Sequence, residues 1–319
     1  MKPKEILVFG ASGQIGRHLI RKLTKNNYKI IAVTRNIHQK GYILKTQANP
    51  GYLELVELNS FDYDKIKSLM NNCSVCINLI GIMFEKRKNN FVNIHIKIPK
   101  LLSKLSSEKK LEQFIHVSSL GIENATDSNY AISKIEGENE VKKFSRSVIL
   151  KPSVVYSVDD NFTTNFFTLL NRVPFFPLYY EGKTKFTPIH VSDLSEIIFQ
   201  VIKKKIIGET IECIGPEELS FKDIILKLLK SIDKKKLLIP MPLNLAKITA
   251  KIFEKMPNPL LTTDQLKLLK YDNIVSGKYK TNFDIGINAN KKFENEIEKY
   301  SFNWRSGGQF SKKSINDVN

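Results

Sequence analysis

A tyrosine and a lysine stand four residues apart in the stretch SNYAISKIEGE, residues 128–138. Because positions i and i+4 share one face of a helix, Tyr130 and Lys134 can converge on one point. A phenol titrates at about pH 10, and an adjacent ammonium stabilises the phenolate and so lowers the tyrosine pKa toward neutrality. Ser118, at the end of an apolar run, can steady a substrate carbonyl. The three side chains therefore predict an acid–base site.

A glycine-rich stretch, GASGQIG, covers residues 10–16 and lies between an apolar run and an amphipathic segment. In a strand–turn–helix unit, Gly10 allows the tight turn, Gly13 lets the backbone approach a pyrophosphate, and Gly16 lets helix and strand pack closely. The phosphates would lie at the helix N-terminus, where N–H groups and the helix dipole attract anions. This placement favours a dinucleotide site over an ordinary glycine-rich turn. The candidate cofactor contacts in the turn are Gly10, Ser12, Gly13, Gln14, Ile15, Gly16 and Arg17.

The end of the second strand indicates which nucleotide is bound. An NAD site keeps an Asp or Glu there for the ribose hydroxyls, whereas this strand ends Val33-Thr34-Arg35 with no carboxylate nearby. Arg35 and Arg17 can pair with a 2′-phosphate through charge-assisted hydrogen bonds. Alternatively, both are ordinary exposed arginines of a basic protein. We expect NADP(H), with Lys134 also hydrogen-bonding the nicotinamide ribose.

The first half of the chain alternates apolar runs with helical periodicity, which predicts a parallel sheet with helices on both faces. The expected strands are EILVFG, KIIAVT, YLELVEL, CINLIGI, QFIHVSS and SVILKPSVVY. One expected helix begins at Gln14 and another follows Ser220. The prediction is an α/β fold with a doubly wound parallel sheet in residues 1–215 and an irregular, substrate-side insertion at 157–186. A smaller, mostly helical lobe at 216–305 and a mobile tail at 306–319 would complete the chain.

Composition excludes several classes of protein. The 319 residues are 42% hydrophobic and 26% charged, as in globular proteins. No apolar run reaches the roughly 18 residues that a membrane-spanning helix needs. The first residues, MKPKEILVFG, have the character of neither a signal nor a transit peptide, so we expect the chain to stay in the compartment where it is made.

Cysteines and net charge add two further expectations. Cys73 and Cys76 have the spacing of a redox or half-zinc motif, but they lead into an apolar strand and only Cys213 remains. We therefore expect reduced cysteines and no metal site. The net charge of +18 fits an anionic membrane, acidic partners, nucleic acid or compositional bias. Nucleic-acid binding is not expected, because the chain has no zinc-finger spacing, RNP motif or arginine tract.

Further segments carry a resemblance that covers the chain from about residue 6 to residue 308. They are INLIGI, FIHVSSLGI, YAISKIEGE, LKPSVVYSVDDNF, TPIHVSD and LTTDQLKLLKYDNIVS. Together with the glycine turn they resemble an atypical branch of the short-chain dehydrogenase/reductase superfamily. That branch is the NADPH-holding accessory subunit of respiratory complex I, with its free-standing bacterial relatives. The last segment is the most diagnostic, because ordinary reductases lack it.

The resemblance implies a Rossmann fold that keeps NADPH bound as a structural or sensing element, away from the electron path. It also implies which residues contact the cofactor: Gly10, Gly13, Gly16, Arg35 and Lys134, with Leu79, Ile80, Gly81, Lys151, Pro152 and Ser153 lining it. Two positions depart from the pattern. Ser157 stands where relatives usually have glycine, and Asn59 stands where many have an aspartate near the adenine.

Residues 243–256, LNLAKITAKIFEKM, predict a basic amphipathic helix bounded by prolines. Lysines repeat along one face, at positions 247, 251 and 255. Apolar side chains cluster on the opposite face, namely Leu245, Ile248, Ile252 and Met256. Such a helix can lie on an anionic membrane or against a partner subunit of complex I. The alternative is a surface helix whose apolar face packs on its own lobe.

Two functions remain open from the sequence. The first, which we favour, is an NADP(H)-binding accessory or regulatory protein near the respiratory chain, without fast turnover. The second is a working NADP-dependent reductase or epimerase acting on a quinone or quinone precursor, with Tyr130 as general acid and Lys134 lowering its pKa. Either protein is expected in the cytoplasm or peripherally on the inner membrane, on the matrix side in a mitochondrion.

Overall fold

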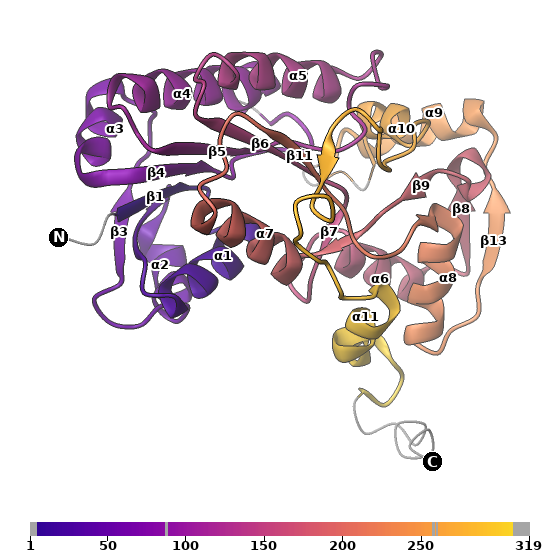
Figure 1. Ribbon diagram of the computed structural model, residues 1–319. Helices are drawn as coiled ribbons and strands as arrows, with labels where there is room; N and C mark the ends of the chain where they lie inside the picture. The colour runs from indigo at the N-terminus through magenta and orange to yellow at the C-terminus, as the bar shows by residue number, and fades with distance from the viewer. Residues whose placement is uncertain (1–4, 87–88, 257–258, 260, 309–319) are drawn as a thin grey trace. The chain divides into compact units, whose positions relative to one another are not determined.

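The computed structural model describes residues 5–86, 89–256, 259 and 261–308, and the chain forms two compact units (Figure 1). The first unit contains the residues up to Pro152, together with Val191–Cys213 and Val275–Asn288. The second contains Ser153–His190, Ile214–Ile274 and the residues from Ala289 onward. The chain therefore passes between the units several times, instead of crossing once near residue 215 as expected. Residues 309–319 of the expected mobile tail lie outside the described residues.

An all-parallel, eight-stranded sheet forms the centre of the first unit, in the order β14-β11-β6-β5-β4-β1-β2-β3. The strands are β1 (Glu5–Phe9), β2 (Lys29–Thr34), β3 (Leu53–Glu57), β4 (Cys73–Asn78), β5 (Gln113–Val117), β6 (Ser147–Pro152), β11 (Thr210–Cys213) and β14 (Lys280–Thr281). The strand order changes direction between β1 and β4, which is where ligands bind in such sheets. The doubly wound sheet predicted from the sequence is confirmed.

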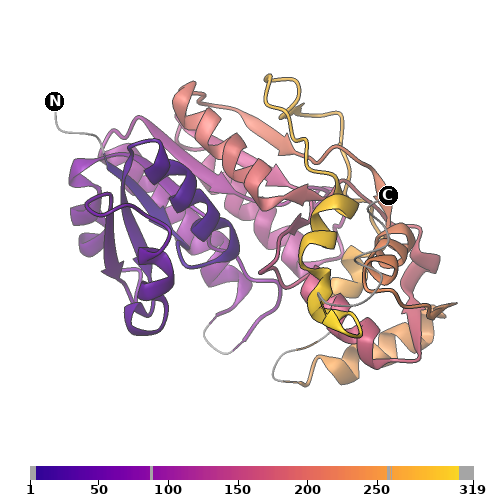
Figure 2. The same cartoon turned by 90° about the horizontal axis from the view of Figure 1, so that it is seen from below.

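Helices cover both faces of this sheet (Figures 1 and 2). One face carries α1 (Gln14–Lys25), α2 (Ile37–Lys45) and α7 (Val191–Lys203), with α1 packed against α7. The other carries α3 (Tyr63–Leu69), the 3-10 turn η1 (Met70–Asn72), the π-helical turn η2 (Val92–Lys97), α4 (Ile98–Glu108) and α5 (Asn129–Val141). Leu102 and Leu105 of α4 share a buried cluster with Leu7 and Phe9 of β1. Cover on both faces explains why β1, β5 and β6 are apolar runs rather than alternating ones.

The second unit is built from short strands and helices around an aromatic core. Its elements are β7 (Val155–Tyr156), α6 (Thr163–Arg172), β8 (Phe175–Leu178), the 3-10 turn η3 (Tyr179–Gly182), β9 (Lys185–Phe186), β10 (Ile189–His190), β12 (Leu219–Ser220), α8 (Phe221–Ser231), β13 (Leu237–Pro240), α9 (Leu243–Phe253), α10 (Thr263–Leu268), α11 (Phe293–Ser301) and the 3-10 turn η4 (Phe302–Trp304). Tyr156, Phe167, Phe176, Phe221 and Phe293 are buried in one cluster.

The segment expected to be an irregular insertion at residues 157–186 is instead partly regular. It contains α6, and β8 pairs in parallel with β13. Phe167 and Leu170 are three residues apart on α6 and both are buried, which is the spacing of a helix face. Because the segment is rich in aromatic residues, its helical periodicity was not recognised from the sequence.

No helix among the described residues is long and apolar enough to cross a bilayer.

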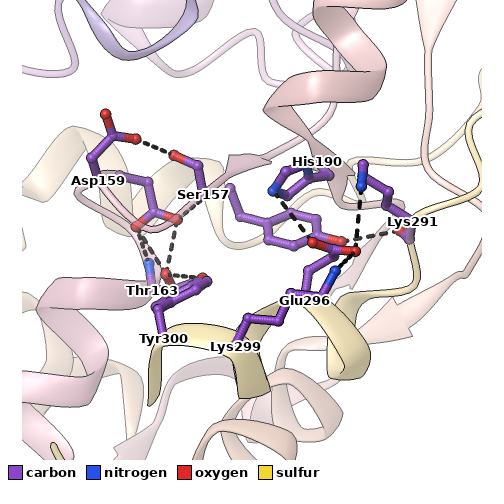
Figure 3. Close-up of polar contacts among 10 residues, drawn as sticks. Ser157, Asp159, Thr163, His190, Lys291, Glu296, Lys299 and Tyr300 are labelled. Carbon is purple, nitrogen blue, oxygen red and sulfur yellow. Dashed lines mark hydrogen bonds and ion pairs between the residues drawn. The ribbon is translucent and has the colours of Figure 1, made fainter. Parts of the chain in front are cut away.

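The carboxylate of Asp160 holds the start of α6, and Figure 3 shows the contacts of Ser157, Thr163 and Tyr300 in this region. The Asp160 side chain accepts hydrogen bonds from the N–H of Ser157 at 2.9 Å and of Thr163 at 2.7 Å. The Thr163 hydroxyl also bonds the hydroxyl of Tyr300 on α11, at 2.9 Å. Ser157 does not adopt the positive φ that would require glycine, and its hydroxyl donates to Asp159 at 2.6 Å. Serine is therefore compatible with this loop.

Candidate functional site

The glycine turn after β1 leads into a helix N-terminus that no side chain caps. Gly13 is the N-cap of α1, Gln14 and Ile15 are its first residues, and its first turn contains no acidic side chain. Gly10 has φ +78°, and a Cβ there would lie 3.0 Å from the carbonyl carbon of Leu79. A Cβ on Gly16 would lie 2.3 Å from the carbonyl oxygen of Ala11. Glycine is thus required at both positions, and the turn can present backbone N–H groups to an anion.

Two arginines lie near this turn, as the sequence predicts. Arg17, on the first turn of α1, donates a hydrogen bond from its guanidinium to the Ser12 carbonyl oxygen at 3.1 Å. Arg35 directly follows β2 and its side chain is exposed. The hydroxyl of Thr34, the last residue of β2, bonds the Ser12 hydroxyl at 3.2 Å. The end of the second strand is therefore joined to the glycine turn.

The expectation of no carboxylate near this strand end is wrong, because Glu57 of the neighbouring strand β3 pairs with Thr34. Its carboxylate accepts the Ile37 N–H at 3.1 Å and the Asn59 amide at 3.1 Å. These two hydrogen bonds, that of Ile37 above all, lower the pKa of Glu57 below its ordinary value. Both carboxylate oxygens thus already accept hydrogen bonds from the protein. The Asn59 amide thus helps to orient this carboxylate.

Leu79, Ile80 and Gly81 follow β4 and connect the glycine turn to Lys134. The missing Cβ of Gly10 faces Leu79, and the Ile80 N–H donates to the Asn78 side chain at 3.1 Å. At the other end of the segment, a Cβ on Gly81 would lie 3.4 Å from Lys134 Nζ. The glycine turn, this lining segment and Lys134 therefore form one continuous site within the first unit.

Tyr130 and Lys134 lie on α5, as predicted, and both are buried, with exposed fractions of 7% and 5%. The Lys134 ammonium lies 5.9 Å from the centre of the Tyr130 ring. It donates to the Val117 carbonyl oxygen at 3.4 Å. Among the residues that the structure describes, this oxygen is its only hydrogen-bond acceptor. An ammonium has three donors, so further donors remain beside Gly81.

The pKa values of this pair differ from the expectation. Burial raises the pKa of Tyr130, and a hydrogen bond with Ser119 only partly opposes the rise. Burial also lowers the pKa of Lys134 to about 8, with Glu138 opposing and Lys151 adding to the fall. The prediction that Lys134 lowers the tyrosine pKa is wrong in this structure. Instead, burial keeps the phenol protonated while Lys134 remains mostly charged at pH 7.

The serine that contacts Tyr130 is Ser119, whereas Ser118, predicted to steady a substrate carbonyl, contacts Glu138. The Ser118 hydroxyl donates to Glu138 at 2.5 Å, and its N–H donates to the Leu150 carbonyl oxygen. Ser118 is buried, whereas Ser119 is partly exposed and forms the hydrogen bond with Tyr130. Successive residues at a strand end point in opposite directions, so the adjacent serines have different surroundings. Sequence reasoning missed Ser119, and the signal was the Ser-Ser pair itself.

Ser118 belongs to a buried charge cluster, which we define as Ser118, Glu123, Glu138 and Lys151. Lys151 Nζ has no exposed surface and contacts Glu138 at 3.0 Å and also Glu123. It lies 5.5 Å from the centre of the Tyr279 ring. Burial lowers the pKa of Lys151, but Glu138 and Glu123 outweigh burial and raise it overall.

The three residues predicted to line the cofactor after β5 have different surroundings. Lys151, expected to line the cofactor, is held by carboxylates, and Pro152 is the last residue of β6. Ser153 belongs to the second unit, where its hydroxyl donates to the Asn273 side chain at 2.5 Å. Glu138 was missed by sequence reasoning, although it continues the four-residue spacing of Tyr130 and Lys134 on α5.

A histidine completes the surroundings of Tyr130. His95, on η2, lies edge-on to the Tyr130 ring at 5.3 Å and stacks on Phe91 at 5.1 Å. Its Nε2 accepts the Ile82 N–H at 3.2 Å, and its Nδ1 bonds the Ser133 hydroxyl at 2.9 Å. Burial, and then the charge of Lys134, lower the pKa of His95 to about 3. This neutral imidazole fixes the backbone after Gly81, and no sequence pattern indicated it.

The cysteines are free thiols, and no metal centre is found within the described part of the chain. Cys73 and Cys76 are three apart on β4, so their side chains lie on opposite faces of the sheet. Burial raises the pKa of Cys73 to about 12. In the described ranges, no group of three His, Cys, Asp or Glu side chains could hold a metal ion.

The sheet order, the glycine turn at its switch point and the Tyr130–Lys134 helix define a nucleotide-binding α/β protein of the dehydrogenase type. The model of the NAD dependent epimerase/dehydratase family matches residues 6–213. The chain belongs to this family.

The chain is similar to several proteins named as subunits of respiratory NADH dehydrogenase. The chain is 27% identical over 285 residues to the mouse mitochondrial NADH dehydrogenase [ubiquinone] 1 alpha subcomplex subunit 9, covering 88% of this chain and 75% of the relative. It is 24% identical to the mitochondrial 40 kDa subunit of NADH-ubiquinone oxidoreductase from Neurospora crassa, covering 88% and 74%. Among solved structures, DesIV, a dTDP-glucose 4,6-dehydratase from Streptomyces venezuelae with NAD and TYD bound, has a TM-score of 0.71. It is 16% identical and covers 98% of each chain.

Proposed function

We propose that this chain holds NADP(H) as a structural or regulatory cofactor and associates with respiratory complex I. One observation carries the nucleotide part of the proposal: the continuous surface from the glycine turn to Lys134. Gly10 has φ +78°, and a Cβ on Gly16 would collide with the Ala11 carbonyl oxygen. Both glycines therefore form the tight turn and the close helix packing that place a helix N-terminus against a pyrophosphate. At the other end, the buried ammonium of Lys134 has donors for the ribose hydroxyls.

The choice of the phosphorylated nucleotide rests on Arg35 and Glu57. The exposed guanidinium of Arg35 follows β2, where a 2′-phosphate would lie. Glu57 is the carboxylate that could take ribose hydroxyls instead, but Ile37 and Asn59 already donate to its oxygens. The local charge therefore supports a phosphate contact, which an arginine can make in a bidentate manner.

A holding role is supported by the burial of the tyrosine and by the relatives. Burial raises the pKa of Tyr130, which makes the phenol a poorer acid for turnover at neutral pH. Both relatives reported above are named as subunits of mitochondrial NADH dehydrogenase or NADH-ubiquinone oxidoreductase. The proposed location is accordingly beside the respiratory chain, at the inner membrane on its cytoplasmic side, or on its matrix side in a mitochondrion.

Native mass spectrometry of freshly purified protein tests the proposal. The expected result is one bound NADP(H) per chain that survives gel filtration, and a melting temperature that rises with added NADPH more than with NADH. Co-migration with complex I on native gels of the source membranes tests the partner. A protein that retains no nucleotide, and whose melting temperature ignores both nucleotides, would overturn the nucleotide part.

Arg35→Ala separates the two nucleotides. Removing a charge-assisted contact to phosphate is expected to weaken NADPH binding by about 10- to 100-fold, and to leave NADH binding unchanged. Arg21→Ala is the matched control, because Arg21 is also an exposed arginine, on α1. Equal losses for NADPH and NADH in Arg35→Ala would contradict the assignment of Arg35 to the 2′-phosphate.

A second function, an NADP-dependent reductase, is favoured by one observation. Ser119, Tyr130 and Lys134 are together in the first unit, with Ser119 hydrogen-bonded to Tyr130, which is the set of groups that proton transfer to a carbonyl or quinone needs. NADPH oxidation with a short-chain quinone, followed by absorbance, tests it. Tyr130→Phe should then lower turnover by about 100-fold or more while NADPH binding is retained. No turnover in the unsubstituted protein would leave the holding role.

A further inference from the structure

Helix α9 has three different faces. The buried face consists of Ala246 and Ala250, which pack in a small cluster with Tyr179 and Leu266. The lysine face and the apolar face predicted from the sequence are both exposed. The alternative in which the apolar face packs on its own lobe is therefore wrong. The reason is that the small alanines, not the large aliphatic side chains, let α9 approach its neighbours closely.

The helix predicted over residues 243–256 ends at Phe253. We call the exposed side chains Leu245, Ile248 and Ile252 of α9, together with Met256 three residues past its end, the α9 apolar row. Their side chains are 52%, 55%, 60% and 47% exposed. β13, the strand that leads into α9, adds Leu237 and Ile239, which are 67% and 40% exposed. Scattered single apolar side chains are normal on a protein surface, but a contiguous row indicates a surface that a partner covers.

The neighbouring charges select the kind of partner. Lys247 and Lys251 of α9 and Lys255, two residues past its end, are exposed. At about 100° per residue, Lys247 and Lys251 lie on the face next to the apolar row. No Asp or Glu occurs within α9, and Glu254, the residue after it, accepts a hydrogen bond from the Thr263 hydroxyl at 2.8 Å. Protein–protein interfaces are depleted in lysine and enriched in aromatic residues and arginine, whereas this surface is aliphatic and lysine-rich. An anionic lipid surface fits it better, since acyl chains take the aliphatic groups and phosphates take the ammonium groups.

We propose that α9 docks this protein on an anionic lipid bilayer. The helix lies in the plane of the membrane, with the α9 apolar row below the headgroups and the three lysines at the lipid phosphates. The long lysine side chains reach upward to the phosphates while their methylene groups stay in the apolar layer. The surface belongs to the second unit, so its function goes beyond nucleotide binding and can fail or succeed independently of it.

Sedimentation of the full chain with vesicles tests the proposal. Vesicles of phosphatidylcholine alone are compared with phosphatidylcholine mixed with phosphatidylglycerol, at low and at physiological salt. The expected result is binding to the anionic vesicles that weakens with salt, and much weaker binding to the neutral ones. Equal binding to both compositions, or none to either, would overturn the proposal.

Matched variants separate the α9 surface from general charge. Replacing Lys247, Lys251 and Lys255 by Gln is expected to weaken binding by about fivefold per lysine, or roughly 100-fold in all. Ile248→Ser combined with Ile252→Ser is expected to weaken it about tenfold or more. The controls are Leu226→Ser, at a 45% exposed apolar residue of α8, and a triple Gln variant of the exposed first-unit lysines Lys25, Lys45 and Lys278. Losses in the controls as large as those in the α9 variants would refute the assignment.

A protein partner gives a different pattern. If the protein ignores vesicles but co-migrates with complex I, and the α9 variants abolish that co-migration, the surface binds a subunit and the lipid proposal is wrong. NADPH retention is measured on every variant, because it should not change. This readout distinguishes failure of the docking proposal from failure of the nucleotide proposal.

Discussion

Replacing Glu138 by glutamine removes one charge from the buried charge cluster without changing the shape of the side chain. In the protein, the Glu138 carboxylate is 4% exposed and lies 3.0 Å from the fully buried ammonium of Lys151. Removing one partner of a buried ion pair costs about 3–5 kcal/mol, because the other charge stays buried. Glu123, whose side chain is 21% exposed, remains beside Lys151. We therefore expect the lower end of that range, about 3 kcal/mol.

Glu140→Gln is the matched control, because Glu140 lies two residues further along the same helix. Its partners Lys100 and Lys143 are 61% and 67% exposed. Exposed pairs of this kind contribute about 0–1 kcal/mol. Both substitutions remove one negative charge from α5, so the difference between them, about 2 kcal/mol or more, measures burial and not charge.

Hydrogen exchange followed by mass spectrometry is the suitable assay, on peptides that cover β5 and β6. The fluorescence of Trp304, the single tryptophan, reports on the second unit and not on this cluster. Adding Lys151→Met to Glu138→Gln should restore part of the lost stability, because the unpaired ammonium is then absent. Equal effects of the Glu138 and Glu140 substitutions, or no recovery in the double variant, would refute the assignment of a buried ion pair.

Three further outcomes are expected. Gly16→Ala should destabilise the protein by about 1–3 kcal/mol and abolish NADPH retention, because a Cβ would lie 2.3 Å from a backbone oxygen. Gly41→Ala is the control: its Cβ meets only side chains of Ile37 and Leu55, so this variant should fold and bind normally. Calorimetry and native mass spectrometry check both variants. The Lys134 pKa falls from 10.5 to about 8 on folding, so between these pH values the unfolded chain binds more protons and the unfolding free energy should rise with pH; Lys134→Met should remove this rise in urea titrations. Ser118→Ala should lower the unfolding free energy in the same urea titrations, since Glu138 loses a hydrogen-bond donor. Ser119→Ala should leave the unfolding free energy within about 0.5 kcal/mol. It should instead change the pH titration of the Tyr130 phenol, followed by ultraviolet absorbance.

The sequence predicted those parts of the site that depend on local pattern. The positions of the first five strands along the chain, the start of α1 at Gln14 and the placement of Tyr130 and Lys134 on one helix follow from apolar periodicity and glycine spacing. The sixth predicted strand, SVILKPSVVY, is divided into β6 and β7. The fourth strand was expected to continue to Ile82 but ends at Asn78. The Asn78 side chain accepts the Ile80 N–H, so the apolar residues that follow leave the sheet and line the glycine turn.

Features that depend on long-range contacts could not be predicted in this way. Glu57 is far from Arg35 in sequence, and only the pairing of β2 with β3 brings it to the strand end. Whether Ser118 or Ser119 contacts Tyr130 depends on which of the two serine side chains points toward Glu138 of α5. The pKa of Tyr130 depends on burial by Phe91 and His95, which the spacing of Tyr130 and Lys134 does not encode. For α9, the pattern gave the helix, but not which face packs.

The interleaving of the chain between its two units has a consequence for biosynthesis. The outer strand of the large sheet, β14, comes from the segment Val275–Asn288, which returns to the first unit late in the chain. Until the ribosome has translated that segment, β11 is an unprotected edge, and such edges recruit other nascent chains into aggregates. The carboxylate of Glu212 on β11 likewise lacks the hydrogen bond from the Ser276 N–H, 3.0 Å long in the complete chain, until Ser276 is translated. Premature termination between β11 and residue 275 should therefore yield polypeptides that depend on chaperones for solubility.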